Sequence, residues 1–86
     1  MDVGWMGENA AVSRRFHLTF PERLISEPVL FTMGKRFGVV PNIRRASVEE
    51  HAAWVILELE GEAEAVDEGI GWLRDQDVTV EEMDET

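Results

Sequence analysis

The chain has 86 residues, 18 of them acidic and 8 basic, so it carries a net charge of −10, and it contains no cysteine. This length provides one small domain with a single core. The lack of cysteine excludes a disulfide framework, a thiolate metal site and a cysteine nucleophile. The net charge argues against a long polyanion such as nucleic acid as a partner.

Among the eight basic residues there is a single lysine, Lys35. Such a composition is typical of proteins from high-salt cytoplasms, and equally of ordinary acidic proteins from GC-rich genomes. The longest apolar run, residues 52–57, is far too short to span a membrane. The N-terminus lacks the basic and apolar regions of a signal peptide. We therefore expect a cytoplasmic protein with no direct membrane insertion.

The first half of the chain predicts a tail, a strand and a helix. Residues 1–13 have no hydrophobic period and are predicted to form a flexible tail. Residues 14–20 alternate apolar and polar, which predicts a half-buried strand. After a connector at 22–25, Ser26 is expected to cap a helix that has Pro28 in its first turn. Gly38 is expected to end this helix.

The second half predicts two adjacent strands, a helix and a last strand. The strands cover residues 39–47 and 52–60, with a polar turn between them. In the second of these strands Val55, Leu57 and Leu59 share one face. A helix is predicted over 62–75, a strand over 78–83, and a frayed end over 84–86. With right-handed crossovers, the order βαββαβ predicts an α+β ferredoxin-like sandwich over residues 14–83, with a four-stranded antiparallel sheet and two helices on one face.

Several motifs in this span resemble those of the NIL domain. They are Pro28-Val29-Leu30 at the helix start, Asn42-Ile43 in the second strand, the run from Trp54 to Gly61, and Ile70-x-Trp72-Leu73 in the second helix. NIL domains are best known as the C-terminal regulatory domain of methionine-import ABC ATPases, where they pair and bind methionine near the interface. The chain has neither a phosphate-binding G-x-x-x-x-G-K-[ST] motif nor cysteines. We therefore expect a stand-alone module, neither the ATPase nor the family's iron–sulfur fusion.

The resemblance implies a ligand site at Asn42 and Ile43, with Pro41 and Arg44 beside them. An amide offers both donor and acceptor atoms, and an arginine can hold a carboxylate in a bidentate pair. The implied ligand is an amino acid such as methionine. Each residue also has a purely structural interpretation: Asn42 ends a turn, Ile43 packs in the core, and Arg44 and Arg45 are solvated on opposite faces of the strand. Arg44 stands where the family usually has leucine.

Trp54, Ile56 and His17 are predicted on the sheet face opposite the helices. A two-layer sandwich leaves that face open, so these side chains favour a partner surface, most simply a second copy in a homodimer. The alternative is a partly solvated tryptophan. The two histidines, His17 and His51, lie far apart in sequence and do not suggest a metal site, and we expect no cofactor.

The sequence thus predicts a regulatory module that senses an amino acid and acts through a transporter or enzyme partner in methionine transport or metabolism. The alternative is a protein-interaction adaptor with the same fold and no ligand. An enzyme is not expected, because no nucleophile or enclosing loop accompanies Glu58, Glu81 and Glu82. The RNA-recognition motif shares the fold but needs aromatic residues on its central strands and a basic surface. It is a distant third interpretation, because the net charge of −10 opposes RNA.

Overall fold

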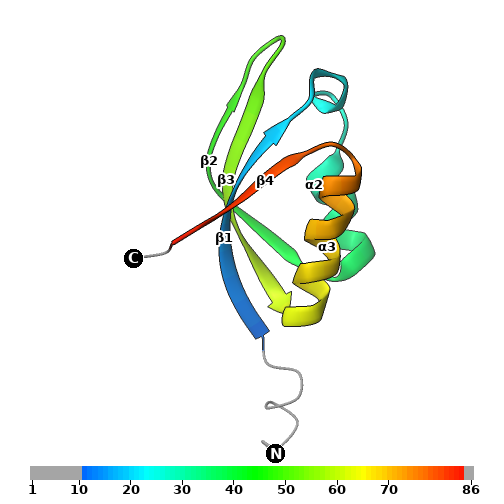
Figure 1. The fold of residues 1–86 in the computed structure, drawn as a ribbon, viewed down its shortest axis with the longest axis vertical. Helices are drawn as coiled ribbons and strands as arrows, with labels where there is room; N and C mark the ends of the chain where they lie inside the picture. The colour runs from blue at the N-terminus through cyan, green and yellow to red at the C-terminus, as the bar shows by residue number, and fades with distance from the viewer. Residues whose placement is uncertain (1–10, 85–86) are drawn as a thin grey trace, which may run out of the picture.

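The computed structural model describes residues 11–84. Its elements in chain order are β1 (Ala11–Phe20), the short 3₁₀-helix η1 (Glu22–Leu24), α2 (Val29–Phe37), β2 (Val40–Val48), β3 (Ala53–Glu62), α3 (Ala63–Asp75) and β4 (Thr79–Met83). The strands form one antiparallel sheet in the order β2-β3-β1-β4, and both α-helices cover the same face (Figure 1). This confirms the predicted ferredoxin-like fold.

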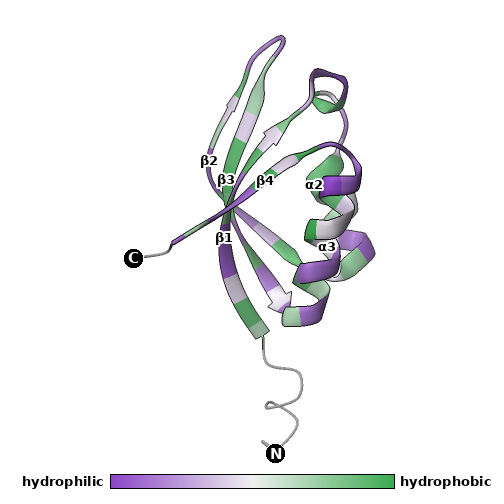
Figure 2. Cartoon of the chain, in the orientation of Figure 1, coloured by the Kyte–Doolittle hydropathy of each residue, from purple (hydrophilic) through white to green (hydrophobic). Residues whose placement is uncertain are grey.

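The core lies between this sheet face and the two helices. In β3, Val55, Leu57 and Leu59 are buried, as their alternation predicts, whereas Trp54 and Ile56 are half-buried on the other face. Figure 2 shows the hydrophilic tip of the β2–β3 hairpin, which projects beyond the helical layer. The side chains that are completely buried belong to Phe16, Leu18, Met33, Leu57, Leu59, Val66 and Leu73.

The first strand begins earlier than its periodicity predicts. Ala11, Val12 and Ser13 pair with Glu62, Gly61 and Glu60 of β3, so residues 11–13, predicted as tail, belong to β1. The pairing with β3 supplies the hydrogen bonds that local periodicity cannot reveal. The rest of the predicted tail, including Trp5 and Met6, lies outside the described residues, as do residues 85–86 of the predicted frayed end.

The start of α2 also differs from the prediction. Ser26 does not cap the helix; the N-cap position is Pro28, and no side chain bonds there. The connector instead winds into η1, and the amide of Glu27 donates to the carbonyl of Leu24 at 3.0 Å. The helix end is as predicted, because Gly38 adopts φ 71° and its amide donates to the Gly34 carbonyl at 2.9 Å.

The second strand is an edge strand with an irregular register. Asn42 is opposite Glu58, and Ile43 is opposite Leu57, but Arg45 rather than Arg44 is opposite Ile56. The extra residue forms a β-bulge at Arg44. Two expectations are wrong. Because of the bulge, Arg44 and Arg45 do not point to opposite faces. Because β2 is an edge strand, Ile43 is 57% exposed instead of packed in the core.

The two α-helices pack closely where α3 carries Gly69. A Cβ atom at this position would lie 2.9 Å from the sulfur of Met33 on α2, so the glycine allows the close approach.

Within residues 11–84, neither helix is long and apolar enough to cross a bilayer.

Candidate functional site

The open face of the sheet, opposite the helices, carries a cross-strand row of polar residues. Asn42 of β2 is opposite Glu58 of β3, and Glu58 is opposite Arg15 of β1. These residues alternate with the buried positions of their strands, which is why their side chains point away from the helices. The sheet pairing therefore brings an amide, a carboxylate and a guanidinium together from three strands.

Glu58 is the centre of this row. Arg15 donates from Nη2 to Glu58 Oε2, and Arg44 donates from Nη2 to Glu58 Oε1, each at 2.7 Å. Although it lies on the open face, Glu58 is only 7% exposed. The hydrogen bonds from Arg15 and then from Arg44 hold the pKa of Glu58 below its ordinary value, against the raising effect of burial. The carboxylate is therefore ionised at neutral pH and held between two cations.

Sequence patterns alone do not reveal this cluster. From the sequence, Glu58 is a candidate only for acid–base chemistry, and Arg44 only for a ligand contact or a solvated side chain. The bulge is the missing information, because it turns Arg44 to the open face, where its side chain meets Glu58. Arg15 and Glu58 each lie at polar positions of alternating strands, but only the β1–β3 register shows that they are neighbours.

A second row on the same face is more apolar. Ile56 of β3 is opposite His17 of β1, and the His17 ring stacks on Trp54 with centroids 5.6 Å apart and planes 19° apart. The structure thus brings His17, Trp54 and Ile56 together, next to the polar row. His17 Nδ1 lies 3.6 Å from Glu81 Oε1, which is too long for a hydrogen bond.

Two polar atoms on this face lack a partner. Arg15 Nε and His17 Nδ1 are shielded from solvent and make no hydrogen bond with any described residue. Buried polar groups are nearly always satisfied in folded proteins. These two atoms therefore mark a place where the open face offers more hydrogen bonding than the chain itself uses.

The four predicted ligand residues lie on two different faces of the sheet. Asn42 and Arg44 lie on the open face. Pro41 and Ile43 pair with the buried Leu59 and Leu57, and therefore lie on the helix-facing side of β2. Pro41 is close to α2, since a Cβ atom on Gly34 would lie 3.4 Å from Pro41 Cδ.

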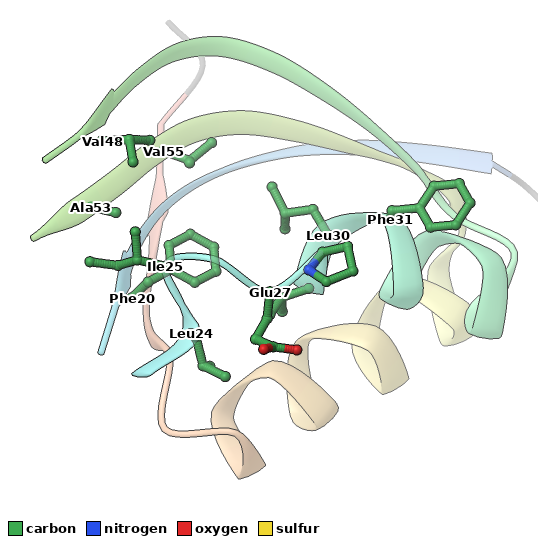
Figure 3. Close-up of a pocket in the computed structure, with 11 residues that line it drawn as sticks. Phe20, Leu24, Ile25, Glu27, Leu30, Phe31, Val48, Ala53 and Val55 are labelled. Atoms are coloured by element: carbon green, nitrogen blue, oxygen red, sulfur yellow. The ribbon is translucent and has the colours of Figure 1, made fainter. Parts of the chain in front are cut away.

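An apolar cavity of about 190 Å³ lies on that helix-facing side. It is bounded by the β2–β3 hairpin, the end of β1, η1 and the start of α2 (Figure 3). Leu30 points from α2 toward the sheet, and the carboxylate of Glu27 points away from the hairpin. At the hairpin turn, His51 Nδ1 lies 2.6 Å from Glu22 Oε2 of η1, which connects the hairpin to this helix. Ligand pockets usually measure about 300–1,000 Å³, so this cavity has room for one or two side chains rather than a large ligand.

Within residues 11–84, no group of three or more histidine, aspartate or glutamate side chains could hold a metal ion. Glu81 and Glu82, which the sequence suggests with Glu58 as a carboxylate group, have different partners. Glu81 is next to His17, whereas Glu82 accepts hydrogen bonds from Arg14, which hold the pKa of Glu82 below its ordinary value.

Comparisons with known proteins agree with this architecture. Residues 14–82 match the NIL domain. The fold is similar to that in the crystal structure of the C-terminal domain of an ABC transporter ATP-binding protein from Enterococcus faecalis, with a TM-score of 0.72, 19% sequence identity and coverage of 100% of both chains. No curated protein matches the chain.

The fold and the site define a small ferredoxin-like α+β domain with a polar cluster on its open sheet face. Because the family match covers most of its length, the chain belongs to the NIL domain family, whose members serve as regulatory domains of ABC transporter ATPases.

Proposed function

We propose that this NIL domain is a regulatory module that binds an amino acid such as methionine on its open sheet face and passes the occupied state to a partner protein in methionine transport or metabolism. The observation that carries the proposal is the cluster of Asn42, Arg44, Glu58 and Arg15. It offers both signs of charge within one cross-strand row, next to apolar and aromatic groups.

The cluster suits the chemistry of a free amino acid. An amino acid carries a carboxylate, which guanidinium groups bind well, and an ammonium, which a carboxylate or an amide oxygen accepts. The unsatisfied Nε–H of Arg15 is a donor for the ligand carboxylate once the side chain rotates. Asn42, which makes no hydrogen bond to other described side chains, provides the neutral contact.

The adjacent apolar row suits the rest of a methionine side chain. A thioether makes favourable contacts with aromatic rings, and Ile56 with the His17–Trp54 stack lies beside the polar cluster. A site on an open face is exposed on one side. A second copy placed on this face would cover the ligand and would bury the half-buried side chains of Trp54 and Ile56, so the proposal includes a homodimer.

Isothermal titration calorimetry with methionine tests the ligand. We expect saturable binding, on the order of micromolar to millimolar because few contacts are available, and weaker binding by Asn42→Ala. Ile43→Ala, one residue along on the other face, is the matched control and should bind like the wild type. Loss of binding in Ile43→Ala with retention in Asn42→Ala would place the site on the helix-facing side and refute the proposed site.

Sedimentation at high salt tests the dimer, because repulsion between two copies of charge −10 must first be screened. Trp54→Glu should convert dimer to monomer, since it places an unpaired charge in the interface. Circular dichroism of the variant checks that it remains folded. A wild type that stays monomeric at high concentration and high salt would refute this part.

An adaptor without a ligand is the second candidate, and a specific observation favours it. Arg44 occupies the position where the family usually has leucine, and it neutralises Glu58, so the cluster can be a purely structural charge pair. The titration decides between the two: no heat and no chemical-shift change with any amino acid would favour the adaptor.

A further inference from the structure

The charges of this acidic chain are unevenly distributed. Residues 28–48, which form α2 and β2, include four of the eight basic residues and none of the 18 acidic ones. The four are Lys35, Arg36, Arg44 and Arg45. This part of the domain is therefore positive, while the rest is strongly negative.

Most of these cations have no carboxylate partner. Among residues 11–84, Lys35, Arg36 and Arg45 form no ion pair, although the chain is rich in acidic groups. By contrast, Arg14 and Arg23 elsewhere in the fold pair with Asp67 and Asp77. Unpaired cations keep a positive potential at the surface and attract an acidic partner.

The same part of the surface is apolar. The four exposed large hydrophobic side chains among the described residues all lie on α2 and β2: Phe31, Val40, Ile43 and Val48, which are 55–67% exposed. Lys35 Nζ lies 5.7 Å from the centre of the Phe31 ring. We call the surface formed by Phe31, Lys35, Val40, Ile43 and Val48 the basic apolar edge, and we include Arg45, which flanks it from the open face, opposite Ile56.

Two hollows are positioned along this edge, and Phe31 borders both. The first is the cavity of Figure 3, where Phe31 lies on α2 and Val48 on the hairpin. The second, of about 260 Å³, is lined by Phe31, Lys35, Val40 and Pro41 among others. Each hollow has room for an apolar side chain of a partner. Lys35 lines the second hollow, and Glu27 is the one acidic residue among the described residues that line the two hollows. The edge therefore combines anchor positions with positive charge from Lys35 and Arg45, which is the composition expected of a protein-binding surface.

We propose that the basic apolar edge docks an acidic amphipathic helix of a partner protein, with apolar side chains in the two hollows and carboxylates facing Lys35 and Arg45. This rests on the proposed function, because it identifies the chemistry of the partner through which the module acts. β2 has nine residues, about 30 Å at 3.3 Å per residue. A helix of about 20 residues has the same length.

Other occupants fit this edge less well. A partner strand added to β2 would meet Pro41, which has no N–H, and the bulge at Arg44, both of which interrupt the edge ladder. A second copy related by two-fold symmetry would place the basic edge against itself. A head-to-tail contact between copies would leave the edge open at one end of a growing chain.

The test uses a synthetic fluorescent peptide of about 18 residues that forms a helix with Leu and Phe on one face and Glu elsewhere. A matched peptide has Lys in place of Glu. Fluorescence anisotropy should show saturable binding of the Glu peptide, weakening with salt, and about fivefold weaker or no binding of the Lys peptide. Lys35→Glu should weaken binding of the Glu peptide about fivefold, and Phe31→Ser should weaken it further.

Arg74→Glu is the matched control, because Arg74 also lacks an ion-pair partner among the described residues but lies on α3, outside the edge. It should bind the peptide like the wild type. Equal binding of both peptides, or equal weakening by Arg74→Glu and Lys35→Glu, overturns the proposal.

Self-association that is abolished by Phe31→Ser also overturns the proposal, since the edge would then join copies of this chain. The methionine titration of the wild type and of Asn42→Ala is measured in parallel. Failed peptide binding with intact, Asn42-dependent methionine binding removes the docking surface alone. Failed methionine binding with intact peptide binding leaves the edge as the docking surface of an adaptor.

Discussion

Leu57 and Ile43 provide a direct test of the edge position of β2. They are opposite each other in the β2–β3 pairing and both face the helix side of the sheet, yet Leu57 is completely buried and Ile43 is 57% exposed. Truncation of each to alanine removes a similar apolar side chain. The two variants therefore differ mainly in burial, which only the tertiary structure assigns.

The expected magnitudes differ by about threefold. Leu57→Ala removes buried methyl groups and leaves a cavity, which costs about 3 kcal/mol or more of unfolding free energy. Ile43→Ala removes a side chain that is less than half buried and should cost about 1 kcal/mol or less. A domain of this size has roughly 5 kcal/mol in total, so Leu57→Ala should lose most of its stability, with a melting temperature lower by about 12 °C or more.

Urea denaturation followed by circular dichroism measures both variants, with unchanged slopes showing that the extent of unfolding is the same. The measurement is made on dilute protein, so that the domain is monomeric. Equal costs for Leu57→Ala and Ile43→Ala would refute the reasoning, because Ile43 would then be buried and β2 would not be an open edge strand. A cost of Ile43→Ala that increases with protein concentration would show that a second copy covers the edge.

Two further predictions concern single residues. Because its folded pKa is lowered, Glu58 should stabilise the fold above its unfolded pKa of about 4.3 and lose this contribution as pH falls through the folded pKa. Glu58→Gln should therefore lose the most unfolding free energy, relative to the wild type, near pH 7, and this loss should disappear in acid; urea denaturation measures it. Glu49→Gln, in the exposed turn, is the control. A loss that does not change with pH would contradict the pairing. Gly38→Ala should cost about 1–2 kcal/mol, because alanine disfavours φ 71°, whereas Gly71→Ala, in α3 with open space around the added Cβ, should stabilise by about 0.5–1 kcal/mol; a shift of the same sign in both melting temperatures would contradict the assigned backbone.

Local patterns were enough to predict the elements and most of the core. The alternation in β3 identifies Val55, Leu57 and Leu59 as buried, and Gly38 ends α2 because an αL residue there favours glycine. These properties depend on neighbours in sequence: the period of two places side chains on alternate faces, and a left-handed residue closes a helix. The order of the elements then leaves one simple topology, which the structure has.

The candidate site depended on contacts between residues far apart in sequence. Nothing local to β2 predicts the bulge that brings Arg44 to Glu58, or the edge position that exposes Ile43. Arg15 and Glu58 are 43 residues apart, and only the strand register makes them neighbours. The sequence alone therefore determined the fold and the family resemblance, while strand pairing decided which side chains share a face, because a shift of one residue moves every side chain to the other side of the sheet.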